Sequence, residues 1–300
     1  MTRLKLNLLI IVAVVAALCP CNVLGSPSPD DKAKIGEILT RHLDSIGKPE
    51  VRKATRPRVI AGALEVMFRA RTTAKGKGLF VMASEGAWNV LKMDFGANQY
   101  PFDRVGFNGS KVTASQISPG AYSNLGNFVR SYPVLLKEGL LGGALTSAWL
   151  PLNLGDSKGQ LEYGGTKEIN NRRAHEIKFR PAGGSDLKIS FFFDAETYQH
   201  VRSVYAYVIS ARMSPGGLGR SSGGNDRTGE GSASQSETRV ELREDFSDFR
   251  SESGLTLPHT YKIHWETIGA GSQFTDWVLT LNRFMFDTHL EAKHFDVSAN

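Results

Sequence analysis

The sequence predicts a mainly β protein with a helical cover, an α+β fold of about ten or eleven strands. In the stretch 187–209, apolar residues recur at every second position on both sides of the turn Asp194–Thr197. That period is the period of a pleated strand with one apolar face. Short turn sequences separate many such runs, which favours antiparallel neighbours. The 300 residues are 41% apolar and 22% charged, which is typical of one folded domain.

The first 25 residues have the pattern of a secretory signal. Arg3 and Lys5 precede an apolar run that ends near Leu18, and small Gly25 stands before Ser26. The run is short for a membrane span. We therefore expect export through a cleavable signal peptide and a single mature domain over 26–300.

Both cysteines, Cys19 and Cys21, lie at the end of this leading segment. A chain that begins at Ser26 therefore has no disulfide and no thiolate nucleophile. A lipid-anchored form with Cys19 or Cys21 as its first residue is the weaker alternative, because Leu18 and Pro20 are poor residues to precede that cut.

An amphipathic helix opens the mature chain. Ser28-Pro29-Asp30-Asp31 is typical of a helix start, and apolar residues then follow a 3.6-residue stripe until Gly47 and Pro49. His42 lies on that stripe without a second metal ligand at a convincing spacing. We interpret His42 as a packed core residue.

Strands follow from Pro57 onward, interrupted by one helical segment. Asn108-Gly109 predicts a hairpin with a type I′ turn. Residues 121–150 are apolar on more than one side, kinked at Pro133, and need cover from a sheet or a ligand. Two structural roles explain this apolar pattern equally well, a helical plug over a β core and a movable lid.

The second half of the chain contains one long interruption. Residues 213–236 are rich in Gly and Ser without periodicity, which predicts a loop between two strands. The net charge of +6 includes Arg3 and Lys5, so a chain beginning at Ser26 carries +4. The basic residues are scattered, and no nucleic-acid partner is expected.

The sequence contains none of the common catalytic, metal or cofactor motifs. His175-Glu176 lacks the second histidine of a zinc protease, and His259 and His264 lie on opposite faces of a strand. The acids Glu244-Asp245 and Asp248 are interpreted as solvated charge pairs with neighbouring arginines. We therefore expect no catalytic residues, no metal and no cofactor.

The repeated wide aromatic face has two interpretations, an ordinary closed β core and a surface that holds an apolar ligand. The second interpretation predicts a ligand site on the inward positions of several strands. The candidate residues are Leu64, Val66, Phe68, Ile189, Phe191, Phe193, Tyr205, Tyr207, Val240, Leu242, Ile263 and Trp265.

Several short motifs occur in a characteristic order. They are the helix end Leu43-Asp44-Ser45-Ile46-Gly47, the strand from Arg58, the turn Phe193-Asp194-Ala195-Glu196-Thr197 with Val201-Arg202, and Phe246-Ser247-Asp248-Phe249-Arg250 through Gly254-Leu255-Thr256-Leu257-Pro258. With these motifs the chain resembles the outer-membrane lipoprotein-sorting superfamily, the LolA/LolB-like periplasmic carriers.

The resemblance implies an open, curved antiparallel half-barrel whose apolar concave face holds lipid or lipoprotein acyl chains under covering helices. It further implies a periplasmic monomer, with transient membrane contact and envelope partner proteins. Two departures stand out: the chain is longer than a typical carrier, mainly through 121–150 and 213–236, and the family's lid-fastening arginine matches no single arginine here.

Three functions remain open at this point. The first is a non-enzymatic carrier of lipid or lipoproteins, and the second is a structural or interaction protein of the cell envelope on the same fold. The third is a secreted hydrolase with a dispersed site around His175, His200 or an acid near them. The cargo and the direction of transfer are not encoded in any motif.

The signal pattern gives a first testable expectation. The mature chain should begin near Ser26, because Gly25 is the small residue before the cut. Intact-mass measurement of the exported protein checks this, and a diacylated chain starting at Cys19 or Cys21 would contradict it.

Overall fold

The computed structural model describes residues 29–70, 72–97, 100–209, 237–269 and 272–298. Within these residues, twelve antiparallel strands form one sheet, so the predicted fold class is confirmed. The strand count is slightly higher than expected. The expected signal segment 1–25 and the expected loop 213–236 lie outside the described residues.

The sheet is a single open layer with β5 at one edge and β6 at the other. Its spatial order is β5-β4-β3-β2-β1-β12-β11-β10-β9-β8-β7-β6. The strands are β1 (Arg58–Arg69), β2 (Thr73–Glu85), β3 (Trp88–Ala97), β4 (Tyr100–Phe107), β5 (Val112–Ala114), β6 (Gln160–Ile169), β7 (Arg172–Arg180), β8 (Lys188–Asp194), β9 (His200–Ile209), β10 (Thr238–Glu252), β11 (Leu255–Ile268) and β12 (Gln273–Met285).

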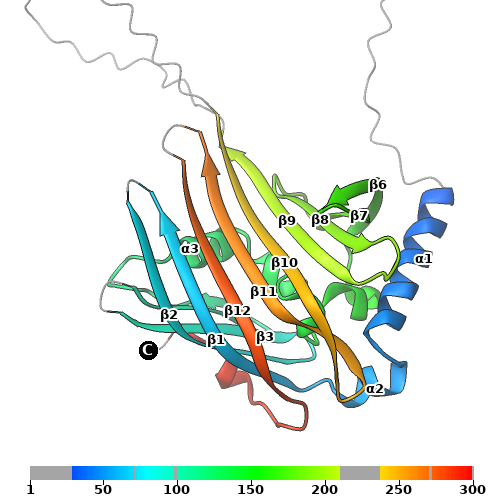
Figure 1. The fold of residues 1–300 in the computed structure, drawn as a ribbon, viewed down its shortest axis with the longest axis horizontal. Helices are drawn as coiled ribbons and strands as arrows, with labels where there is room; N and C mark the ends of the chain where they lie inside the picture. The colour runs from blue at the N-terminus through cyan, green and yellow to red at the C-terminus, as the bar shows by residue number, and fades with distance from the viewer. Residues whose placement is uncertain (1–28, 71, 98–99, 210–236, 270–271, 299–300) are drawn as a thin grey trace, which may run out of the picture.

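The pairing of β1 with β12 joins two meanders into one sheet (Figure 1). The chain starts in the centre at β1, runs outward to the edge at β5, and begins again at the opposite edge with β6. Residues 115–159 must therefore pass from one edge of the sheet to the other. This connection contains the apolar segment that needed cover.

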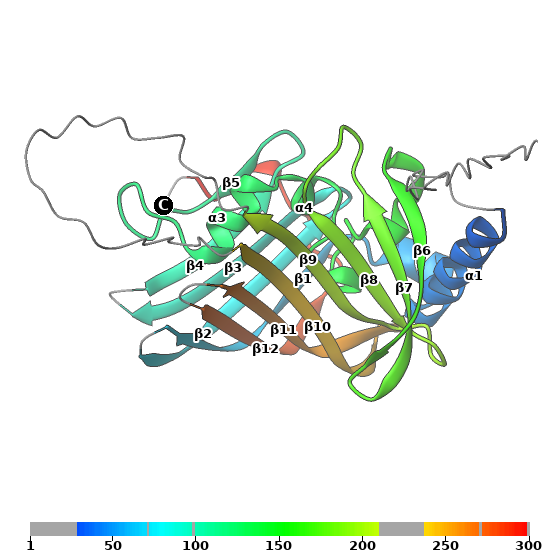
Figure 2. The same ribbon diagram turned by 90° about the horizontal axis from the view of Figure 1, so that it is seen from above.

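The crossing segment consists of short helical pieces on one side of the curved sheet (Figure 2). Ser123 caps the first of them, because its Oγ accepts a hydrogen bond from Gly126 N at 2.8 Å. The pieces are α3 (Asn124–Ser131), α4 (Val134–Lys137), η1 (Gly143–Leu145), η2 (Leu150–Leu152) and η3 (Leu154–Asp156). The break between α3 and α4 falls at Pro133, as the sequence predicts.

The N-terminal helix α1 (Pro29–Ile46) packs beside β6 at one edge of the sheet. Its buried stripe includes Ile35, Ile38 and His42, which matches the predicted amphipathic pattern. α1 ends at Ile46, before Gly47 and Pro49 as predicted, and Pro49 begins a separate short helix, α2 (Pro49–Ala54). Proline is tolerated at a first helical position because no intrahelical bond needs its missing N–H.

Two hairpins of the sheet differ in the geometry of their turns. Asn170 and Asn171 both have positive φ, 51° and 62°, as a type I′ turn requires. At the other hairpin, Phe107 pairs with Val112, which leaves a four-residue loop in which Gly109 has φ 92°. The hairpin predicted at Asn108-Gly109 is therefore confirmed, but its turn is not type I′, because Asn108 does not have a positive φ.

The C-terminal segment covers part of the outer face of the sheet. The 3₁₀ turn η4 (Ala292–Phe295) packs on β3. It completes a small second core that consists of Ala83, Val90, Leu290, Phe295 and Val297. The large core cluster of the described residues lies on the inner face, under the crossing segment.

Candidate functional site

The twelve predicted ligand residues all belong to the inner apolar layer of the sheet. Cross-strand pairing brings Ile189, Tyr205, Leu242 and Trp265 into one continuous row over β8 to β11. Ten of the twelve side chains are buried, and the exceptions Phe68 and Tyr207 are partly buried against the same cluster. The period-2 pattern therefore identified which side chains share a face.

Two further residues connect the predicted set and were missed. Trp277 pairs with both Ile263 and Val66, and its neighbour on the inner face is Leu279. Trp277 and Leu279 are fully buried. Their alternation in β12 is visible in the sequence, but only the β1–β12 pairing places them between the two groups of predicted residues.

A continuous buried stretch of the crossing segment, residues 139–150, fills the space inside the curved sheet; we call it the plug. Every residue of the plug is buried. Trp149 is its largest side chain, with its ring centroid 5.1 Å from that of Phe191. The plug thus contacts the wall that the sequence assigned to a ligand.

Arg58 of β1 ties the plug to the sheet from one side. Arg58 as a whole is 1% exposed. It donates hydrogen bonds to the carbonyl oxygens of Thr55 at 3.0 Å, Ala144 at 2.5 Å and Thr146 at 3.4 Å. Burial, with a smaller contribution from the charge of Arg56, lowers the pKa of Arg58 to about 10, so Arg58 stays charged at neutral pH. Arg58 thereby takes a plug-fastening position that the sequence alone could not assign.

Glu244 of β10 ties the plug from the opposite side. Its Oε1 accepts a hydrogen bond from Gly142 N at 2.7 Å and is also contacted by the hydroxyl of Tyr261. The side chain is fully buried. The prediction that Glu244 is a solvated charge is therefore wrong, whereas Asp248 does pair with Arg250 at the surface. Glu244 points inward because it alternates with the outward Asp245.

The contacts of Tyr205 indicate that Glu244 is protonated. The Tyr205 hydroxyl lies 2.6 Å from Glu244 Oε2 and 2.6 Å from the carbonyl oxygen of Leu140. One hydroxyl hydrogen cannot serve two acceptors, whereas a protonated Oε2 donates to Tyr205, which then donates to Leu140. Burial raises the pKa of Glu244, which favours the same neutral form.

Two buried histidines lie where α1, the plug and the sheet meet. His42 Nδ1 donates to the carbonyl oxygen of Tyr198 at 3.0 Å, and His42 Nε2 accepts from Trp149 Nε1 at 3.0 Å. Burial lowers the pKa of His42 to about 4. His42 is therefore a neutral, fully bonded core residue, as its position on the apolar stripe predicts.

The second histidine, His200, does not form a nucleophile and base pair with Ser203, although the two lie 3.0 Å apart. His200 Nε2 is 2.9 Å from the carbonyl oxygen of Arg202, which can only accept, so Nε2 carries a hydrogen. It cannot also take the Ser203 proton. Among the described residues, His200 Nδ1 has no hydrogen-bond partner.

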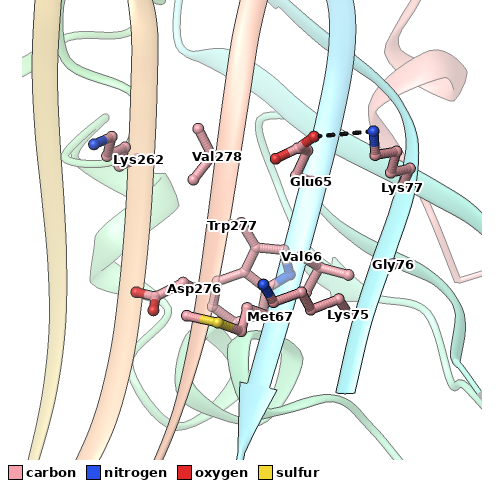
Figure 3. A pocket seen from close by; sticks show the side chains of 10 residues that line it. All are labelled: Glu65, Val66, Met67, Lys75, Gly76, Lys77, Lys262, Asp276, Trp277 and Val278. Atoms are coloured by element: carbon pink, nitrogen blue, oxygen red, sulfur yellow. Dashed lines mark ion pairs between the residues drawn. The ribbon is translucent and has the colours of Figure 1, made fainter. Parts of the chain in front are cut away.

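Two hollows lie against charged side chains of the outer face. One, of about 710 Å³, is crossed by the Glu65–Lys77 ion pair and flanked by Lys75, Lys262 and Asp276 (Figure 3). Of the twelve predicted residues, Val66 alone lines it. The other, of about 720 Å³, includes Ile189 and Tyr207 among many charged residues.

Metal-binding clusters and membrane-spanning helices are both absent from the described residues. Among the described residues, no group of three or more His, Cys, Asp or Glu side chains is placed to hold a metal ion. Within the same part of the chain, none of the helices has the length and apolar character needed to cross a membrane.

The geometry defines a single curved antiparallel sheet whose apolar inner face is closed by a plug of its own chain. No family model and no curated protein matches the sequence. The chain is similar in structure to a LolA superfamily protein from Nitrosomonas europaea, at 10% identity, covering 87% of this chain and 96% of that one, with a TM-score of 0.45.

A second similar structure is an outer membrane lipoprotein-sorting protein domain from Vibrio parahaemolyticus. It has 12% identity, coverage of 86% of this chain and 97% of that chain, and a TM-score of 0.40. Both similarities are likenesses of fold alone.

The protonation of Glu244 gives a testable pH dependence. Its pKa in the folded state is raised above the ordinary value of 4.5, so its stabilising contribution is complete below about pH 4.5 and is lost as pH rises through the folded pKa. Glu244→Gln stays neutral and keeps donor and acceptor atoms. The free energy of unfolding of the parent relative to Glu244→Gln should fall with rising pH, at a slope of up to about 1.4 kcal/mol per pH unit.

Urea unfolding at a series of pH values measures this difference. Taking the difference between two proteins cancels the titration of His42 and other unchanged groups. Glu168→Gln, at an exposed position, is the matched control and should show no such trend. A parent-to-Glu244→Gln difference that is constant with pH would show that Glu244 is not held protonated.

Proposed function

We propose that the protein is a non-enzymatic carrier that binds lipid acyl chains on the inner face of its sheet. The observation that supports it most directly is the plug: an apolar wall is covered by a segment of the same chain instead of a second sheet. Each CH₂ group removed from water contributes about 0.8 kcal/mol, so an acyl chain could replace the apolar contacts of the plug.

The hydrogen bonds that hold the plug are compatible with a segment that leaves the sheet and returns to it. The polar contacts of Arg58 and Glu244 with the plug, to Ala144, Thr146 and Gly142, are hydrogen bonds to its backbone. Such contacts fix the backbone position of the plug and depend little on the identity of its side chains. Opening exposes Phe191 and its neighbours, which are the residues proposed to contact the acyl chain.

A carrier function also has consequences for cellular location and for binding partners. We propose export through the signal segment, a periplasmic location as a monomer, transient membrane contact, and exchange of lipid or lipoproteins with envelope proteins. The first alternative is an envelope interaction protein in which the plug stays closed. The hydrolase alternative has the weaker support, since His200 and Ser203 are buried and lack the proton arrangement of a catalytic pair.

A disulfide that locks the plug tests the proposal. Ser147 N donates to Ser84 Oγ at 2.8 Å, so Ser84 and Ser147 lie side by side on the sheet and the plug. A chain that begins at Ser26 has no other cysteine. In Ser84→Cys/Ser147→Cys, oxidation should abolish uptake of a fluorescent fatty-acyl probe by the delipidated protein, and reduction should restore it.

Mass spectrometry confirms that the disulfide has formed, and Ser84→Cys alone controls for the substitution. The single variant should take up the probe under both redox conditions. If the oxidised double variant takes up the probe as well as the parent, the inner face is not reached through movement of the plug. If the parent takes up no acyl probe, the carrier function itself fails and the envelope interaction protein takes its place.

A further inference from the structure

A small hollow at the junction of α1, α2, β1 and the end of the plug is lined by positive charge. It has a volume of about 200 Å³. Its lining consists of Leu43, Pro49, Arg52, Lys53, Arg56, Arg58, Ser147 and Leu152. Four of these residues are cations and none is an acid. The acids nearest in sequence, Asp44 and Glu50, are exposed and do not line the hollow.

The four cations have no counter-ion among the described residues. No ion pair is formed by Arg52, Lys53, Arg56 or Arg58 in this part of the chain, although ion pairs are frequent elsewhere in it. Arg58 is compensated only by three carbonyl oxygens. A buried charge normally requires a partner of opposite sign, and the buried Arg58 has no anionic partner among the residues that line the hollow.

The guanidinium of Arg52 supplies an independent observation. Its Nη1 is buried and has no hydrogen-bond partner within the described chain. An unsatisfied donor of this kind is costly, particularly on a charged group. Within the described residues, the hollow therefore contains positive charge without a counter-ion and, at Arg52 Nη1, a hydrogen-bond donor without an acceptor.

We propose that this hollow binds a phosphate group, either free or carried by a lipid. Arginine donors match the oxygens of phosphate in fork geometry, and lysine adds a compact charge. The hollow is smaller than the roughly 300–1,000 Å³ typical of sites that enclose whole ligands, so it fits a small anionic group and not an acyl chain.

The site is separate from the inner apolar face, and the proposal goes beyond acyl binding. None of the twelve candidate acyl-contact residues lines the hollow. Arg58 and Ser147 connect the two regions, because Arg58 lines the hollow and also donates to Ala144 in the plug, and Ser147 lines the hollow and is itself a plug residue. The test therefore leaves Arg58 unchanged and alters the exposed Lys53 and Arg56.

The variant Lys53→Gln/Arg56→Gln removes two positive charges from the rim of the hollow. Its matched control is Lys32→Gln/Arg283→Gln, which removes the same charge at exposed positions that form no ion pair in the described chain. Calorimetric titration with inorganic phosphate, and co-sedimentation with vesicles of phosphatidylglycerol and phosphatidylcholine, measure binding. Vesicles of phosphatidylcholine alone are the blank.

The rim variant should bind at least about tenfold more weakly than the parent, and the control should bind like the parent. Response to inorganic phosphate indicates a free anion, whereas response to phosphatidylglycerol vesicles alone indicates a lipid headgroup. Absence of binding to the parent in both arms, or equal effects of the two double variants, would overturn the proposal. Thermal unfolding and acyl-probe uptake of the same variants separate this result from a folding defect and from the carrier function.

Discussion

The pairing of β1 with β12 is the constraint on which the rest of the structure depends. It joins two meanders at the centre of the sheet, so the chain ends its first half at one edge and starts its second half at the opposite edge. The connection must then cross the inner face. Because that face is apolar, the connection can only be stable if it is apolar as well, and 139–150 meets that requirement.

Two buried polar groups then fix the path of this connection. Arg58 and Glu244 lie on strands on either side of β12 and β11, and each hydrogen-bonds the plug backbone. Arg58 and Glu244 do not form an ion pair with each other. The charge of Glu244 is neutralised by a proton, whereas the charge of Arg58 is stabilised by carbonyl oxygens. The plug is thus held by contacts that depend on protonation and on local charge as well as on apolar packing.

The sequence predicts the inward side chains well because strand alternation is a local property, and Phe191 and Tyr205 lie where that pattern puts them. It does not predict register, so Trp277 was not assigned to the site. The sequence also indicated the wrong environment for Glu244. Two adjacent acids in a strand face opposite sides, and the neighbouring Arg243 favoured the interpretation that Glu244 is exposed to solvent. Arg58 could not be selected because its acceptors in the plug are backbone carbonyls 86 and 88 residues away.

The central claim is that the inner face becomes available when the plug leaves it. This claim is tested most directly by hydrogen–deuterium exchange, which measures amide exchange rates of the delipidated chain with and without a saturating fatty-acyl ligand. The account predicts faster amide exchange in 139–150 when the ligand is bound, with the central strands β1 and β12 unchanged. Unchanged or slower exchange in 139–150 on ligand binding would contradict it.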